Sequence, residues 1–532
     1  MNKVELLKIN RETPFPRIYL MSFHYKMRFQ SNYYINSFFW STVTKVLSAV
    51  LGFITVPLLL GYFGKANYGL LSIATACNGY MHLMDLGMNT GAVKFFSQWA
   101  AEGNKDRIYR VARTNITFYI IVSIINVVGL LALAFWGESL FSVTHEQFIQ
   151  LRTCLYILAL FSTISWVATA FNQLLVADKQ FAFTMQVQSL IIVFKIGLIA
   201  ITIWGRFSLT TYFFWLTLVV AIAIIPYMYK CKNDMLIDSF KPAQYWSDFK
   251  IVLVYSLSLF ALSLFQVTAS QSMPILISMF SNNGAETVAD YRIVEVVPLF
   301  VIMLCGSFMS IFLPKTSELL VRNNTDEINA YVKKWTSLTT ILVCIFCFPL
   351  ILSSSIVISA YVGESYAYLD KWIVLWCAFL IIQLHCTPAY SLILATGKTK
   401  VLVWATGLVC VVSMIINAAL CKAIPVGSAV IGYGTYMSIL VIVYYVYYYN
   451  RYLNLSRLML FKVFIVPVGL AVISSLLPLS LDLDISLFDT FSINDRVKYI
   501  IIFILNSLMW FGMYTILLKF FRLLPSLKDI RK

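Results

Sequence analysis

Four cationic residues inside apolar stretches are the residues of this sequence that could most directly do chemistry. They are Lys45, Lys94, Lys195 and Arg292, whereas every other Lys and Arg can be placed at a helix end or in a loop. A charge at bilayer depth costs about 2.5–3.5 kcal/mol and therefore usually faces a bundle interior or a wet cavity. Several cations around one cavity favour an anionic cargo, so we predict that these four line a shared lumen that binds one.

The four cations differ in their expected depth. Lys195 lies about fourteen residues into its apolar run, roughly 20 Å deep at 1.5 Å per residue. Lys45 and Lys94 lie nearer the predicted cytoplasmic end, where a Lys side chain can also extend to the lipid headgroups. Arg292 has Glu295 three residues later on the same helical face, which predicts either a structural ion pair or a guanidinium that exchanges its carboxylate for a phosphate.

Two carboxylates and two prolines complete the candidate machinery. Asp85 either balances Lys45 or Lys195 or binds a coupling cation. Together with Glu295 it is our candidate for coupling to a proton or sodium gradient. Pro57 and Pro274 lie in similar positions of the two halves of the chain, where each removes a backbone hydrogen bond and bends its helix. They are either hinges for alternating access or static kinks.

Aromatic residues make up 16% of the chain. Most are explained by belts at the membrane interfaces or by core packing. Five could instead stack on sugar rings in a cavity: Tyr80, Trp166, Tyr255, Tyr291 and Trp376.

No arrangement of residues indicates an enzyme, a metal site or a cofactor. The chain has only four histidines, which are widely dispersed, and the one C-x-x-C pair, Cys344 and Cys347, lies in an apolar helix. Small hydrophobic packing explains such cysteines better than metal or redox chemistry does.

The elements that must position these residues are membrane-spanning helices. Hydrophobic residues make up 60% of the 532 positions, charged residues make up 12%, and the mean hydropathy is +0.81. These values predict an all-α polytopic membrane protein. Windows of about 20 residues give about fourteen spans, near residues 37–62, 68–98, 112–136, 150–175, 181–204, 208–229, 249–280, 287–313, 335–361, 371–396, 400–422, 425–450, 457–479 and 497–520.

The net charge of +16 is distributed unevenly. If the amino terminus is cytoplasmic and the spans alternate, most of the 40 Lys and Arg residues fall on the cytoplasmic side. This asymmetry is the positive-inside signature, so we expect both termini in the cytoplasm. Topology accounts for the basic balance, and no nucleic-acid partner is needed. Membrane lipids are the expected partners of the basic arm, residues 1–36.

Short recurring stretches predict an internal repeat. The run from Thr55 to Leu60 resembles the run from Ser272 to Ile277, and the turn at Asp178-Lys179 resembles the turn at Gly397-Lys398. An even number of spans per unit makes the repeat parallel, with the cargo site between the lobes. The predicted organisation is a six-helix lobe (37–230), a cytoplasmic linker (231–248), a second six-helix lobe (249–452), and an extra helix pair with a basic cytoplasmic tail (453–532).

Several of these residues resemble a known family. The run from Ile54 to Gly64, the run from Asn67 to Leu70, and Asp85-Leu86-Gly87 are similar to the opening helices of Wzx-type flippases. These are the O-antigen and capsule repeat-unit transporters of the multidrug/oligosaccharidyl-lipid/polysaccharide exporter superfamily. The resemblance implies a flippase of the bacterial inner membrane that moves undecaprenyl-pyrophosphate-linked oligosaccharide to the periplasmic leaflet. Such a protein would serve lipopolysaccharide or capsule synthesis beside a polysaccharide polymerase and chain-length machinery.

Other functions stay open at this point. A lipid II flippase shares fourteen spans and basic lumen residues, but its typical arginine-bearing start to the first helix is not seen here. A cation-coupled multidrug exporter of the same superfamily usually has twelve spans and carboxylates that bind an ion. A glycan polymerase should show a large outer loop, and an assembly scaffold should tolerate the loss of Lys195 and Arg292.

Overall fold

The computed structural model describes residues 17–309, 325–396, 399–451, 455–481 and 494–523, together with residues 312, 316, 319 and 453. Over this part of the chain the regular structure is helical and contains no strand, which confirms the predicted all-α class. Eleven helices among the described residues are long and apolar enough to cross a membrane, so the chain is a multi-pass membrane protein. Residues 1–16 of the predicted basic arm, the acidic loop 482–493 and the end of the basic tail lie outside the described residues, whereas residues 17–36 of the arm are the start of α1.

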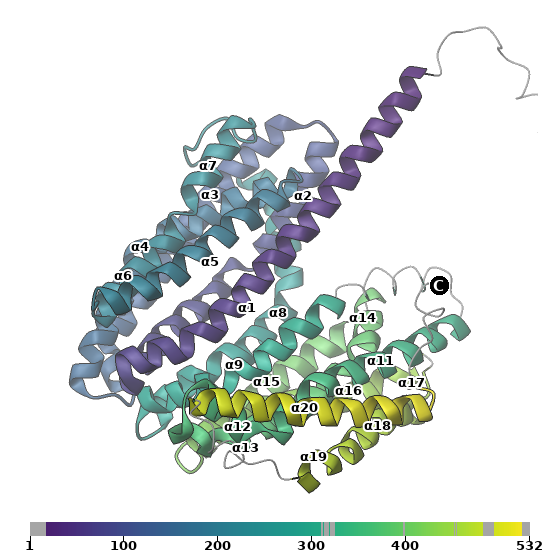
Figure 1. Ribbon diagram of the computed structural model, residues 1–532. Coiled ribbons are helices and arrows are strands. Elements are labelled where there is room, and N and C mark those ends of the chain that lie inside the picture. Colours follow the sequence, from purple (N-terminus) through teal and green to yellow (C-terminus); the bar gives the residue numbers. More distant parts are fainter. Residues whose placement is uncertain are drawn as a thin grey trace, which may run out of the picture.

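The helices form two groups in Figure 1. The first is coloured purple to blue and contains, with the 3-10 turn η2, the helices α1 (Arg17–Met81), η2 (His82–Asp85), α2 (Met88–Ala101), α3 (Lys105–Trp136), α4 (His145–Ala177), α5 (Phe181–Trp204), α6 (Leu209–Ala221) and α7 (Ile224–Asn233). Side chains cap several of these helices: Thr144 and Gln147 form a capping box at α4, and Ser208 accepts a hydrogen bond from the Thr211 amide at α6. Such caps satisfy amides that the first helical turn leaves unpaired.

The second group is coloured teal to yellow. It contains α8 (Trp246–Phe280), α9 (Gly284–Met309), α11 (Thr325–Leu352), α12 (Ser354–Tyr361), η4 (Glu364–Leu369), α13 (Asp370–Leu384), α14 (Thr387–Ala395), α15 (Lys400–Leu420), α16 (Pro425–Val443), α17 (Tyr449–Arg451), α18 (Arg457–Ser474), α19 (Leu476–Leu481) and α20 (Asp495–Phe520). The last three pack against one another, and α18 and α20 also pack on α11.

Several predicted spans are interrupted. The second, predicted as one helix over 68–98, consists of the end of α1, the turn η2 and α2, because Leu86 and Gly87 adopt positive φ angles of 52° and 72°. A helix cannot continue through two such residues. The sixth, ninth, tenth and thirteenth spans also divide into two shorter helices each. Asp85 therefore lies at a break in the backbone, not in the middle of a helix as the sequence predicted.

Helix α1 connects the two groups. It packs on α4 and α5 of the first group and on α8 and α9 of the second. The first predicted span and the beginning of the second lie within it, and the helix bends at Gly64, where φ is 78° and ψ is 167°. Glycine adopts this conformation without the strain that a Cβ would add. Pro57 and Pro274 lie inside α1 and α8, and both helices continue through them in this conformation.

The connection between the groups is tied to α3. Residues 234–245 follow α7, and within them the Lys241 carbonyl accepts a hydrogen bond from Arg113 Nε at 2.9 Å. The hydroxyl of Thr117 donates to the Ala243 carbonyl at 2.6 Å. The predicted inter-lobe linker is thus a structured segment held against the first group.

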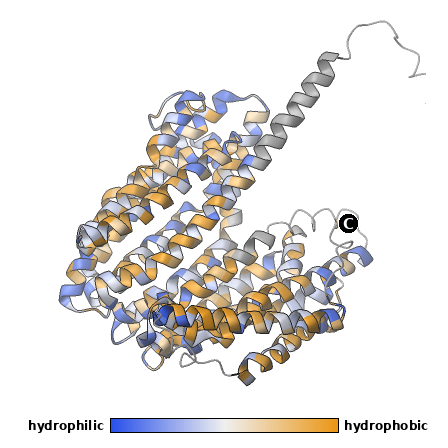
Figure 2. Cartoon of the chain, in the orientation of Figure 1, coloured by the Kyte–Doolittle hydropathy of each residue, from blue (hydrophilic) through white to orange (hydrophobic). Residues whose placement is uncertain are grey.

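Apolar side chains cover much of the helical surface, and hydrophilic residues gather at helix ends (Figure 2). Trp204, Phe38 and Trp136 are 89%, 75% and 70% exposed. Apolar side chains of this size are stable on a surface that contacts lipid instead of water.

Candidate functional site

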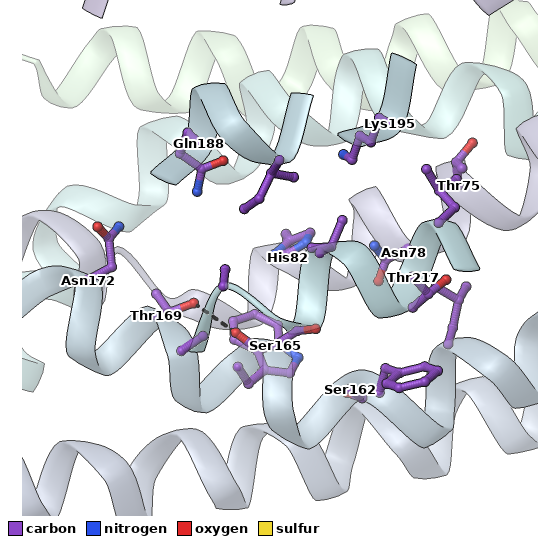
Figure 3. A pocket seen from close by; sticks show the side chains of 18 of the residues that line it. Thr75, Asn78, His82, Ser162, Ser165, Thr169, Asn172, Gln188, Lys195 and Thr217 are labelled. Carbon is purple, nitrogen blue, oxygen red and sulfur yellow. Dashed lines mark hydrogen bonds between the residues drawn. The ribbon is translucent and has the colours of Figure 1, made fainter. Parts of the chain in front are cut away.

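A cavity of about 360 Å³, lined by both polar and apolar side chains, lies within the first group of helices. Its walls come from the second half of α1, from η2, and from α4, α5, α6 and α7. In Figure 3, Lys195 and Gln188 of α5 lie across the space from Ser165, Thr169 and Asn172 of α4. The α4 residues follow helical spacing, since Ser162, Ser165, Thr169 and Asn172 recur every three or four positions along one face.

Lys195 is the cation of this cavity. Its side chain is half-buried and lines the space near the centre of α5. Among the residues that the structure describes, none forms a hydrogen bond or ion pair with it. The described lining residues also include no carboxylate. Lys195 is therefore a basic side chain that faces no carboxylate in the described lining, and its part in an anion site remains a prediction.

Lys45 and Lys94 are exposed and do not line this cavity. Lys45 lies on α1, next to Thr44, whose hydroxyl lies 2.8 Å from that of Ser189 on α5. Lys94 lies on α2, where its ammonium group is 3.6 Å from the centre of the Tyr255 ring on α8. A cation over an aromatic face is stabilised by the ring quadrupole. Lys94 thus contacts a residue of the second group.

Arg292 is held by a carboxylate of its own helix. Its guanidinium forms an ion pair with Glu295, which also accepts a hydrogen bond from the Tyr291 hydroxyl at 3.2 Å. This is the structural pair that the spacing allowed. Arg292 does not line the cavity of Lys195, so the structure does not bring the four predicted cations into one cavity. Their common lumen remains a prediction.

Asp85 belongs to a partly buried hydrogen-bond network beside the cavity. One of its oxygens accepts from the Tyr119 hydroxyl at 2.5 Å, and the other accepts from the Asn89 amide at 3.1 Å. Gln173 donates to the Tyr119 oxygen at 2.6 Å, and Asn115 donates to Gln173 at 2.8 Å. In the described part of the chain no Lys or Arg pairs with Asp85, so the predicted balance with Lys45 or Lys195 is not formed here.

One aromatic side chain joins the network to the cavity. Trp166 lines the cavity and stacks on Tyr119 with the ring centres 5.8 Å apart. The same indole lies 5.2 Å from the imidazole of His82, which also lines the cavity. Trp166 is one of the five residues that the sequence suggested could contact a sugar ring.

The two groups of helices are joined at one end, which we call the closed end. There Lys65 of α1 forms an ion pair with Asp290 of α9 at 2.9 Å. Tyr368 of η4 donates to the same carboxylate oxygen at 2.9 Å and accepts from Lys65 at 3.1 Å. Backbones meet one turn further on, since a Cβ added at Gly69 would lie 1.7 Å from the carbonyl oxygen of Ala285.

Backbone hydrogen bonds reinforce the closed end. The Ser142 amide donates to the Ser278 carbonyl, and the Gly284 amide donates to the Ser142 carbonyl, each at 2.7 Å. Ser142 precedes α4, whereas Ser278 and Gly284 flank the turn between α8 and α9. These bonds cross from the first group to the second.

Sequence reasoning missed most of these polar partners. Lys65 was placed among the basic residues at helix ends or in loops, and Asp290 was not singled out, because their pairing depends on tertiary contact. The polar stripe on α4 was visible in the sequence as Ser162, Ser165 and Thr169 at helical spacing within a predicted span. Asn172, in the same register, extends it.

Comparisons with known proteins agree with this fold. A family model described as "Polysaccharide biosynthesis protein" matches residues 35–320. Among solved structures, a lipid II flippase MurJ in an inward closed conformation has a TM-score of 0.65 at 15% identity, with 90% of this chain and 98% of that chain covered. No curated protein matches the sequence.

Multidrug resistance MATE family transporters of the MOP superfamily are also similar. An inward-facing structure has a TM-score of 0.61 at 13% identity and covers 74% of this chain and 92% of that chain. An outward-facing structure has a TM-score of 0.52 at 14% identity and covers 77% of this chain and 92% of that chain. The chain has the fold of MOP-superfamily flippases and transporters and, because the family model covers more than half of its residues, it belongs to the polysaccharide biosynthesis protein family.

Proposed function

We propose that this protein is a flippase that moves polyprenyl-pyrophosphate-linked oligosaccharide repeat units from the cytoplasmic to the periplasmic leaflet of the bacterial inner membrane. The observation that carries the proposal is the unpaired Lys195 in a partly polar cavity, in a chain of the polysaccharide biosynthesis family. A buried cation without a partner gains most when an anion arrives, because the anion offsets part of its desolvation cost. This favours a charged, hydrophilic cargo.

Alternating access fits the way the two groups meet. The predicted topology puts Lys65 and the turn before α9 outside, so the closed end faces the periplasm. Cargo would then enter from the cytoplasmic side, where Lys94 and Lys45 are exposed and attract an anionic headgroup. The higher TM-score to the inward-facing than to the outward-facing MATE structure supports this assignment.

Asp85 is the better of the two coupling candidates. Glu295 is already engaged by Arg292 and Tyr291. Asp85 has no cationic partner among the described residues and lies at a helix break beside the cavity. A proton or a sodium ion on Asp85 would change its bond with Tyr119 and thereby the packing of Trp166 next to the cargo.

Two relatives define alternative cargoes. Similarity to the MurJ structure favours lipid II, a lipid-linked sugar of related chemistry. Similarity to MATE structures favours a drug, but the described cavity lining has a lysine and no carboxylate, which disfavours a cationic drug. The family match favours a polysaccharide precursor over both.

Deletion of the gene in its native host tests the proposal. Cells without the protein should accumulate lipid-linked repeat units on the cytoplasmic side and lose surface polysaccharide. Lys195→Ala should reproduce this defect at normal protein level, whereas Lys250→Ala, which removes an exposed lysine at the start of α8, should not. Normal surface polysaccharide in the deletion strain would reject the function, and normal export by Lys195→Ala would reject the site.

A further inference from the structure

We infer that the cavity between α1, α4, α5 and α6 is a subsite for one sugar residue of the cargo together with one anionic group that this sugar carries. The inference rests on the proposed function, because it names the part of the lipid-linked cargo that this cavity receives. In this arrangement the cavity recognises the glycan, whereas the exposed Lys45 and Lys94 attract the headgroup.

The charge of the cavity selects the ligand's charge. Lys195 lines it without a partner, and its described lining residues include neither Asp nor Glu. A cationic drug or a sodium ion would meet an unbalanced positive charge there. A ligand with one negative group would neutralise it. A purely neutral ligand would leave the Lys195 side chain without a counter-charge, so its desolvation cost would not be offset.

The uncharged lining selects a hydroxyl-rich ligand. The α4 wall presents Ser165, Thr169 and Asn172, and the opposite wall presents Gln188. Asn172 Oδ1 is shielded from solvent and has no hydrogen-bond partner in the structure. An unpaired buried acceptor costs about 1–3 kcal/mol. A sugar hydroxyl can donate to this oxygen, whereas a lipid chain would leave it unsatisfied.

The remaining wall suits the apolar face of a sugar ring. Trp166 lines the cavity, and its indole is held by contacts with Tyr119 and His82. A ring held in this way loses little conformational freedom when a ligand packs against it. The amides and hydroxyls around it can bond the ring's edge.

The size of the cavity limits how much of the glycan enters. Lys195 and Gln188 are two turns apart on α5, about 10 Å along the helix axis. The volume is about 360 Å³, near the lower limit of small-molecule sites. These dimensions accommodate one sugar with one phosphate or carboxylate group, but not a whole repeat unit. The rest of the oligosaccharide must lie outside the cavity.

Binding of small sugar probes to the full chain in lipid nanodiscs tests the inference. The probes are N-acetylglucosamine 1-phosphate, glucuronic acid, N-acetylglucosamine and inorganic phosphate, with tryptophan fluorescence and calorimetry as readouts. We expect at least one of the two acidic sugars to bind at least fivefold more tightly than both free N-acetylglucosamine and inorganic phosphate. Preference for the sugar phosphate would identify a headgroup-linked sugar, and preference for the uronic acid would identify an acidic sugar within the repeat unit.

Variants assign the two parts of the ligand to the two walls. Lys195→Gln should weaken the acidic sugar by about tenfold or more, to the level of the neutral sugar, because it removes a charge-assisted bond. Asn172→Ala and Thr169→Val should weaken neutral and acidic sugars alike by about two- to tenfold. Lys250→Gln is the matched control and should change nothing. Thermal unfolding of each variant in the same nanodiscs shows whether the fold is retained. Asn172→Ala and Thr169→Val test the same wall separately, so misfolding of one leaves the other as a test.

Three results would overturn the inference. Inorganic phosphate that binds as tightly as both acidic sugars would indicate a simple anion site. Unchanged binding in Lys195→Gln would place the ligand elsewhere, as would the failure of every sugar probe to bind. If no sugar probe binds but cells lacking the protein accumulate lipid-linked repeat units, the flippase function stands and only the subsite is wrong. Tight sugar-phosphate binding without accumulation would uphold the subsite and reject the flippase.

Discussion

Replacing Lys65 by Met should open the closed end of the protein. The Lys65 ammonium lies 2.9 Å from Asp290 and 3.1 Å from the Tyr368 hydroxyl, so three groups from α1, α9 and η4 share one contact. The other oxygen of Asp290 is buried without a partner. Removal of the lysine leaves this carboxylate with the tyrosine as its only remaining partner among the described residues. Opening the closed end would return the carboxylate to water.

The size of the effect follows from how buried the pair is. At 2.9 Å and an effective dielectric constant near 20, the direct attraction is about 6 kcal/mol before desolvation is subtracted. Exposed pairs contribute about 0.2–1 kcal/mol, and loss of one partner from a buried pair costs about 3–5 kcal/mol. The Lys65 side chain is 32% exposed and that of Asp290 is 10% exposed, which places the change at about 1–3 kcal/mol. The ratio of open to closed molecules should therefore rise by about 5- to 150-fold.

The assay uses a buried reporter on the same face of α1. Ser72 lies two turns beyond Lys65 and is buried. A cysteine placed there, Ser72→Cys, should react slowly with a membrane-impermeant maleimide while the end is closed, because position 72 is buried. The native cysteines in the described residues are all buried, so background labelling should be low. Lys65→Met should accelerate labelling by the factor above. The double exchange Lys65→Asp with Asp290→Lys should restore slow labelling. Acceleration below twofold in Lys65→Met, with the fold intact, would refute the reasoning.

Three further variants probe neighbouring features. Gly69→Ala should force α1 and α9 apart, because its Cβ would lie 1.7 Å from the carbonyl oxygen of Ala285, where real contacts are at least 3.0 Å. This variant should raise the labelling rate of Ser72→Cys. Gly61→Ala is the control and should not raise it, because its Cβ would meet nothing within 4 Å. Arg292→Gln alone should lower stability by about 3–5 kcal/mol in thermal unfolding, because it leaves Glu295 without its cation. Adding Glu295→Gln should recover most of that loss, and a double variant as unstable as the single one would contradict a structural pair. Asp85→Asn should abolish gradient-driven transport in proteoliposomes but leave gradient-independent exchange, if Asp85 carries the coupling ion.

The fold class could be predicted from the sequence because the lipid bilayer restricts which backbone structures can cross it. Every backbone group inside the membrane must be bonded within its own segment, so long apolar runs are helices. The fifth span, predicted over 181–204, matches α5 at both ends. The second span was wrong as a single helix because hydropathy does not report backbone dihedral angles. Leu86 and Gly87 break it without any change in apolar character.

The candidate site was only partly predictable. Lys195, which the sequence places in the middle of a span, does line a cavity, and its role there stays a prediction. Which helices surround it was not predictable, because α4, α5 and α6 meet through contacts between distant residues. The α4 stripe needed only a count of polar residues at helical spacing. The Lys65–Asp290 pair joins residues far apart in sequence, and no local pattern predicts such a pair.

The contrast between Lys195 and Arg292 separates two uses of an intramembrane cation. Arg292 carries its counter-charge, Glu295, on the same helix, so its charge is balanced in every conformation that keeps α9 intact. Such a pair needs no ligand. Lys195 has no partner among the described residues, so its charge is balanced only when something enters the cavity. Depth in the membrane therefore does not by itself identify a candidate binding residue. A place in the cavity wall combined with the absence of a fixed counter-charge does, and among the four predicted cations only Lys195 meets both conditions in the described structure.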